Sequence, residues 1–206
     1  MKDLLVVVAD SNMNGIMEGL LPRLHRIERT APFSYEIRVH PLRDAGVRTQ
    51  IVDFVAPDSD DFLNLLVFLD YEGSGSSESV QELQSRIEQD LRNSGWADRV
   101  CVVVFDPECD VWMWVSRNKM SEVFRSPRGN NFPNNVDDWL LGKGFSFVNS
   151  KPERPKEALK ELCREIRLPR SSSLYEQLAA SASYRDCTDP GFLRFRNFIL
   201  EKFSTN

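Results

Sequence analysis

The chain has 206 residues, of which 41% are hydrophobic and 28% charged, a composition typical of a folded globular protein rather than a disordered one. Its formal net charge of −5 argues against tight non-specific binding of nucleic acid over the whole surface. No apolar run approaches the roughly 20 residues that a membrane span requires, so we expect no membrane partner. Four cysteines without a C-x-x-C pair indicate reduced thiols in a cytoplasmic protein.

Three continuous apolar runs in the first half of the chain are typical of strands buried on both faces. They occupy residues 4–9, 65–69 and 100–105. A fourth segment, 35–40, alternates between apolar and polar residues, as a strand with one exposed face does. These runs predict four strands.

Apolar residues at helical spacing predict a helix after the first strand, interrupted at Pro22, and a second helix at 80–91. The stretch 47–63 is ambiguous between helix and irregular structure. Alternation of strands and helices predicts an α/β fold with a mostly parallel sheet, which we assign to a core of residues 1–115. Beyond it the strand signal fades. We expect residues 116–206 to form a helical extension packed on the core, with helices at 155–166, 172–183 and 190–203.

Acidic residues follow the three apolar strands. They are Asp10, then Asp70 and Glu72 in LDYEGSG, then Asp106, Glu108 and Asp110 in FDPECD. The carboxyl ends of parallel strands share one edge of a sheet, so these groups are expected to converge there. Carboxylates close together repel unless a cation joins them, and oxygen ligands suit Mg²⁺ or Mn²⁺. The alternative is that these acids only cap the helices that follow.

Basic residues near this edge are candidates for holding phosphate. Arg43 and Arg48 follow the strand at 35–40, where His40 is a candidate for proton transfer. A polar turn held by an Arg–Asp pair with Asp44 explains the same residues equally well. Lys156 is a third phosphate candidate, although a lysine at a helix start is usually solvated.

The charge is unevenly distributed along the chain. Residues 151–206 carry 11 Lys and Arg against 8 Asp and Glu, a net of +3, and residues 1–150 carry 15 against 23, a net of −8. Solvated basic faces of the C-terminal helices explain this asymmetry. The alternative is a basic flank that holds phosphates beside an acidic metal site.

A strand ending in an acid, followed by another ending in D-x-E, resembles the Toprim fold of topoisomerases, primases and related nucleases. More closely, the chain is similar to a family of small Toprim-like proteins from prokaryotes, nearest to a component of a methylation-associated bacterial defence system. Three segments carry this similarity in the first half of the chain: VADSNM, VHPLRDAGV and LDYEGSG. Later in the chain it is carried by Glu108, Asp110 and Trp112 in PECDVWMW, by Pro155 and Lys156 in RPKEAL, and by Tyr175, Pro190 and Phe192.

The resemblance implies anti-phage defence and a Mg²⁺-dependent nuclease. In that interpretation Asp10, Asp70 and Glu72 are catalytic, and the metal is held by these three with Glu108 and Asp110. Toprim proteins carry Glu where this chain has Asp10, which is one methylene shorter. The alternative is therefore a non-catalytic Toprim-like subunit of a multi-protein defence complex. The expected partners are other defence-system proteins, with DNA or RNA as the substrate of an active site.

Overall fold

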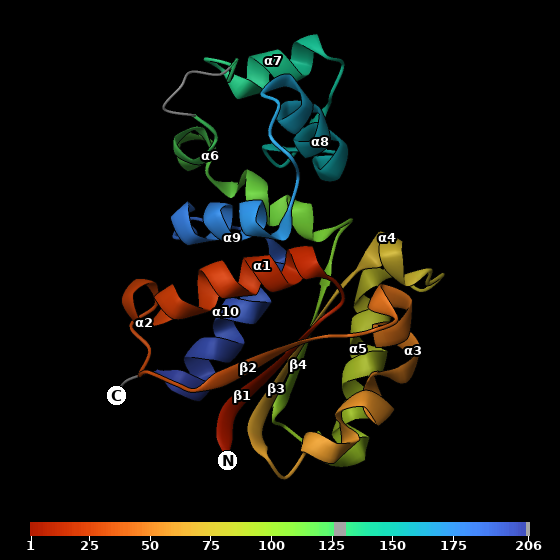
Figure 1. The fold of residues 1–206 in the computed structure, drawn as a ribbon. Coiled ribbons are helices and arrows are strands. Elements are labelled where there is room, and N and C mark those ends of the chain that lie inside the picture. Colours follow the sequence, from red (N-terminus) through yellow and green to blue (C-terminus); the bar gives the residue numbers. More distant parts are fainter. Residues whose placement is uncertain (126–130, 205–206) are drawn as a thin grey trace.

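A computed structural model describes residues 1–125 and 131–204. Its central feature is a four-stranded sheet in the order β2-β1-β3-β4, in which every neighbouring pair is parallel (Figure 1). The strands are β1 (Lys2–Val8), β2 (Tyr35–Val39), β3 (Phe62–Asp70) and β4 (Val100–Phe105). The predicted α/β class with a parallel sheet and flanking helices is confirmed, and it is consistent with a Toprim-like fold.

Helices cover both faces of this sheet. On one face lie α1 (Ser11–Leu20), the short α2 (Leu24–Ile27) and α10 (Pro190–Phe203), and on the other lie α3 (Arg43–Val55) and α5 (Val80–Leu91) (Figure 1). The short α4 (Tyr71–Ser74) follows β3. The C-terminal helix α10 thus packs beside α1 and completes one layer of the core. Buried side chains on both faces explain why β1, β3 and β4 are continuous apolar runs.

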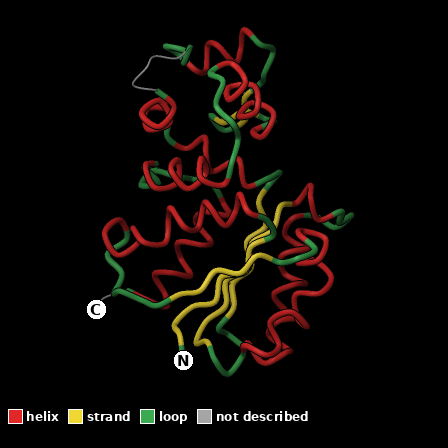
Figure 2. Tube along the Cα trace, viewed as in Figure 1, coloured by secondary structure: helices red, strands yellow, loops and turns green. Residues whose placement is uncertain are grey.

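The remaining helices lie beyond the carboxyl ends of the strands (Figure 2). They are α6 (Arg117–Phe124), α7 (Val136–Gly142), α8 (Pro155–Glu165) and α9 (Ser172–Ser181), with a small antiparallel pair, β5 (Phe147–Val148) and β6 (Lys151–Pro152). Short 3-10 segments, of which Cys109–Val115 follows β4, connect some of these elements. None of the helices in the described ranges is long and apolar enough to cross a membrane.

Two glycines let α1 and α9 approach each other closely. A Cβ on Gly15 would lie 2.2 Å from the main-chain oxygen of Ser172, and one on Gly19 would lie 2.2 Å from that of Glu176. Contacts this short are sterically forbidden, so both positions require the absence of a side chain. The Gly15–Gly19 spacing places both on one face of α1, and this crossing fixes α9 over the carboxyl edge of the sheet.

Three tryptophans, Trp96, Trp112 and Trp114, pack in the interior, and Trp139 is partly buried. Trp112 contacts Phe105 edge-on, with ring centroids 4.7 Å apart, and its Nε1 donates to Asp189 at 3.0 Å. Trp114 is fully buried and donates to the carbonyl of Pro155. Neither ring is exposed, so neither is available to stack on a base. All four cysteines are free thiols, as expected.

Candidate functional site

Asp70 and Asp44 form the centre of the acidic edge. Asp70 ends β3, and Asp44 lies in the first turn of α3, the helix that follows β2. The main-chain N–H of Asp70 donates to Asp44 Oδ1 at 2.7 Å, and Asp70 Oδ1 accepts from the main-chain N–H of Cys109 at 2.7 Å. The Asp70 side chain makes no capping hydrogen bond to α4, so helix capping does not explain this acid.

Asp10 lies at the same edge, after the neighbouring strand β1. Its Oδ1 accepts from the main-chain N–H groups of Asn12 and Met13, both at 2.9 Å, and so caps α1. Capping therefore accounts for one of its two oxygens. The Asp10 charge still acts on the other acids, because it raises the pKa of both Asp44 and Asp70.

Burial and neighbouring acids penalise the charged form of Asp70. Its side chain is buried, and burial raises its pKa well above the ordinary value of 3.8. Asp44, Asp10 and Asp110 raise this pKa further, and the hydrogen bond from Cys109 opposes them. The pKa of Asp44 is raised as well, mainly by burial and also by Asp10. A positive ion at this place would relieve the repulsion.

Asp110 is held by residues from the C-terminal half of the chain. It is 1% exposed, and its carboxylate accepts from Tyr175 Oη at 2.6 Å and from Arg170 Nη2 at 3.2 Å. Arg170 also bonds Tyr175 and lies over its ring. Both oxygens of Asp110 thus have protein partners, and its role as a metal ligand would require breaking this network.

Glu108 pairs with Lys156, which comes from the first turn of α8. Burial raises the pKa of Glu108, and Lys156 opposes that rise. Burial alone would lower the pKa of Lys156, but Glu108, Asp110 and Asp70 raise it above the ordinary lysine value. Lys156 is therefore a protonated cation held among the acids.

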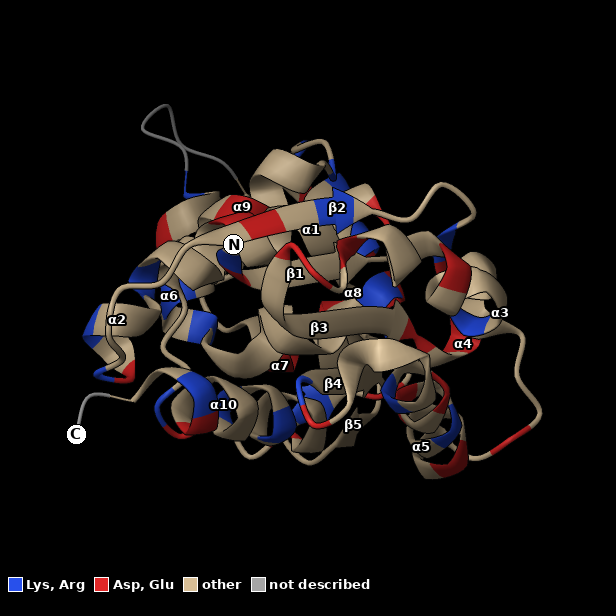
Figure 3. Cartoon of the chain, turned by 90° about the horizontal axis from the view of Figure 1, so that it is seen from below, with Lys and Arg blue, Asp and Glu red and all other residues tan. Residues whose placement is uncertain are grey.

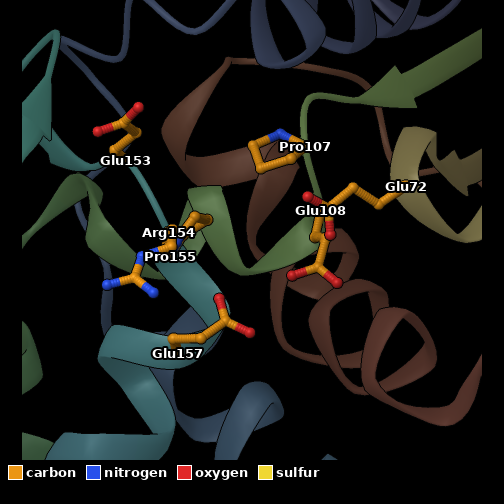
Figure 4. Close-up of a pocket in the computed structure, with 7 residues that line it drawn as sticks. All are labelled: Glu72, Pro107, Glu108, Glu153, Arg154, Pro155 and Glu157. Carbon is orange, nitrogen blue, oxygen red and sulfur yellow. The ribbon is translucent and has the colours of Figure 1, made fainter.

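A pocket of about 250 Å³ opens beside this pair. It is lined by Glu72, Pro107, Glu108, Glu153, Arg154, Pro155 and Glu157 (Figure 4). Glu72 is exposed, and Figure 4 shows its carboxylate close to that of Glu108. Arg154 lies over the ring of Phe145, at 5.3 Å from the centroid. Glu72 thus belongs to the rim of the pocket and not to the Asp44–Asp70 pair.

The predicted metal ligands do not converge as a set of five. Asp10 and Asp110 both raise the pKa of Asp70, whereas Glu72 and Glu108 face the pocket. Within the described ranges, no three His, Cys, Asp or Glu side chains are placed to hold one metal ion together. The donor chemistry of Asp10, Asp44 and Asp70, all carboxylates, suits Mg²⁺ or Mn²⁺, and binding requires their side chains to turn toward a shared ion.

The basic residues predicted after β2 are Arg43, Arg48 and His40, and only Arg43 is freely exposed. Arg48 donates from Nε to the carbonyl of Ser74 at 2.7 Å, and Arg43 is exposed at the start of α3. His40 is buried against Phe54, and its Nδ1 accepts from the main chain of Leu42, which leaves it no access to a substrate. The expected Arg–Asp pair in this turn is wrong, because Asp44 bonds Asp70 instead.

Asp44, Arg170 and Tyr175 were not assigned to the site from the sequence. The sequence offers one reason to include Asp44 in the site, since it lies just after a strand like the other acids. It offers no such reason for Arg170, which lies 60 residues from Asp110 in a segment between helices. Tyr175 was noted only as part of a motif.

Comparison of the chain with protein-family models, with curated proteins and with solved structures gave no match. The resemblance to Toprim-like defence proteins therefore depends on the sequence motifs alone.

Proposed function

We propose that the chain binds one divalent cation, Mg²⁺ or Mn²⁺, through Asp10, Asp44 and Asp70 and hydrolyses phosphodiester bonds at this edge. The observation that carries this proposal is the Asp44–Asp70 pair. The Asp44 carboxylate is held by the main-chain N–H of Asp70, beside the carboxyl end of β3, and burial and the Asp44 charge both raise the pKa of Asp70. A divalent cation would offset that cost.

When bound, such a cation would supply Lewis-acid chemistry to the phosphoryl group and to an attacking water. The protein residues have separate tasks. Asp44 and Asp70 supply oxygen ligands, and Asp10 supplies a third from its uncapped oxygen. Lys156 lies beside these acids and would hold a phosphate of the substrate. The Arg170–Tyr175–Asp110 network fixes the segment after β4, whose Cys109 N–H positions Asp70.

The biological setting is proposed from the resemblance. A role in bacterial anti-phage defence would make DNA or RNA the substrate and other defence-system proteins the partners. The net charge of −5 gives the chain little affinity for nucleic acid by itself, so a partner would have to deliver the substrate.

The second candidate is a non-catalytic subunit of a defence complex. It is favoured because three of the predicted metal ligands already have protein partners. Glu108 pairs with Lys156, Asp110 pairs with Arg170, and Asp10 caps α1. In that case the acids would stabilise the fold or bind a partner without chemistry.

A nuclease assay distinguishes the two candidates. Purified protein is tested with Mg²⁺ or Mn²⁺ on DNA and RNA, alone and with the products of its neighbouring genes. We expect metal-dependent cleavage that Asp70→Asn and Asp44→Asn abolish. Asp53→Asn is the matched control, since Asp53 is an exposed acid of α3. Cleavage that persists in Asp70→Asn, or occurs only through a partner's own site, would reject catalysis here.

A further inference from the structure

The two edge strands of the central sheet differ in whether their outward main-chain groups are already hydrogen-bonded. At the β4 edge, side chains bond the main chain of Val102: its N–H donates to Glu88 Oε2 at 3.3 Å, and its carbonyl accepts from Arg194 Nε at 2.9 Å. Glu88 and Arg194 also pair with each other. These side chains occupy groups that another strand would need, so this edge is closed.

The β2 edge is open. The Ser34 carbonyl accepts from Leu4, and the His40 N–H donates to Val8, so the even-numbered residues of β2 bond to β1. The alternation of a parallel ladder then turns the main-chain groups of Tyr35, Ile37 and Val39 outward. No strand within the described ranges pairs with this side of β2. Figure 3 shows β2 as the outermost strand, with charged residues along it.

The side chains of β2 are complementary to those of a second copy of the same strand. Within one chain Glu36 pairs with Lys2 and Arg38, and Arg38 also pairs with Asp58. If two copies pair antiparallel about Ile37, then Glu36 faces Arg38 of the partner subunit and extends this network, and Tyr35 faces Val39 of the partner subunit. Opposite charges and aromatic–β-branched pairs are favourable when they face each other across strands. Because Glu36 and Arg38 have no outward main-chain groups, they form non-hydrogen-bonded pairs, whose side chains lie closest.

The charges also select this register. The outward main-chain N–H and C=O groups of one copy must bond those of the other. The nearest alternative registers therefore move the two-fold centre of the antiparallel pair from Ile37 to Glu36 or to Arg38. Either shift places two like charges directly opposite each other on the two-fold axis, which is destabilising. The register centred on Ile37 pairs opposite charges on both sides.

Apolar surface beside the strand favours the same partner. Val39 is 43% exposed, and Tyr35 lines an apolar pocket of about 140 Å³ with Phe33 and Pro32. Residues that face each other across an antiparallel pair lie on the same face of the sheet. Val39 of the partner subunit would therefore cover Tyr35 at the rim of this pocket, which removes apolar surface from water.

We propose that β2 is a dimerisation edge, at which two copies of the chain pair antiparallel about Ile37. The pairing makes about six main-chain hydrogen bonds from three residues of each copy. It joins two four-stranded sheets into one continuous sheet with the closed β4 edges at its ends. The interface is isologous, as a two-fold axis requires. The two acidic sites then lie on opposite rims of that sheet, so the dimer is independent of the proposed metal chemistry.

Sedimentation velocity over a concentration series tests the proposal. We expect the wild type to dimerise at concentrations up to about 100 μM. Glu36→Arg should weaken dimerisation at least tenfold, because the introduced guanidinium then faces Arg38 of the partner subunit. Arg164→Glu, an exposed reversal on α8, is the control that should leave dimerisation unchanged.

Ile37→Pro provides a second variant that acts on the main chain. Its missing N–H points outward, so the fold retains its bonds to β1, and the dimer should be lost. Circular dichroism verifies folding of each variant. A wild type that stays monomeric, whether or not it captures another protein, overturns the proposal. So does a dimer that survives Glu36→Arg.

Discussion

The main-chain N–H of Asp70 donates to the carboxylate of Asp44, which joins the end of β3 to the first turn of α3. This bond holds two acids together although it serves only one of them, and the pKa of each is raised by burial. Gly73 lies over Asp44 so closely that a Cβ there would approach Oδ2 to 2.5 Å. Main chain thus packs against Asp44 on the Gly73 side, and Lys156 is a nearby protein cation that lowers the pKa of Asp44.

Asp70→Asn should stabilise the metal-free protein at neutral pH. Because the folded pKa of Asp70 is raised, the folded state binds a proton that the unfolded state releases, and stability falls as pH rises above the ordinary value of 3.8. Below that pH both states are protonated and the penalty vanishes. Urea unfolding should show a higher unfolding free energy for Asp70→Asn at pH 7 and little difference at pH 3. Equal stability at pH 7 would contradict the buried, repelled state of Asp70.

Arg170→Met should destabilise the fold by about 3 kcal/mol, because it leaves the buried Asp110 charge without its cation. Tyr175→Phe removes one hydrogen bond to the same carboxylate and should cost about 1–2 kcal/mol. Chemical denaturation measures both losses. The Arg170→Met loss should shrink at acid pH, as Asp110 takes up a proton. A loss that does not change with pH would mean that Arg170 acts through packing.

Lys156→Met should strengthen binding of Mn²⁺ several-fold, on the order of 1 kcal/mol, because it removes a positive charge from beside the acids. The same change should weaken cleavage of nucleic acid, since the proposed phosphate contact is lost. Calorimetry and the nuclease assay measure the two effects separately. If both binding and cleavage improve, Lys156 acts only as a counter-ion to Glu108.

Gly15→Ala and Gly19→Ala should each destabilise the protein by about 1–3 kcal/mol, because the added methyl meets the main chain of α9. Gly142→Ala in α7 is the matched control, since its Cβ would meet nothing within 4 Å. Alanine is favoured over glycine in a helix, so this control should be neutral or slightly stabilising. Thermal unfolding of the three variants measures the difference. If Gly15→Ala and Gly19→Ala melt at the same temperature as Gly142→Ala, then α1 and α9 can move apart without loss of stability, which would contradict the close crossing.

The sequence identifies most of the elements, because burial on both faces leaves continuous apolar runs for β1, β3 and β4. The helix at 190–203 is predicted at its observed bounds. The helix α3 is not, since Leu42 offers no side-chain cap and Arg43 begins the helix with a φ of 52°. The site is predicted only in part. Strand ends place Asp10 and Asp70. The cations that neutralise Asp110 and Glu108 are Arg170, between α8 and α9, and Lys156 of α8, and tertiary packing brings both to the site.

Titration of Mn²⁺ into the metal-free protein, followed by calorimetry, is the most direct test of the acidic site. We expect one ion to bind per chain to the wild type and to Asp53→Asn, and binding to weaken at least tenfold, about 1.4 kcal/mol, in Asp44→Asn and in Asp70→Asn. Wild-type affinity in either of these two variants, with the fold intact, would contradict the proposed site, as would a wild type that binds no ion at all.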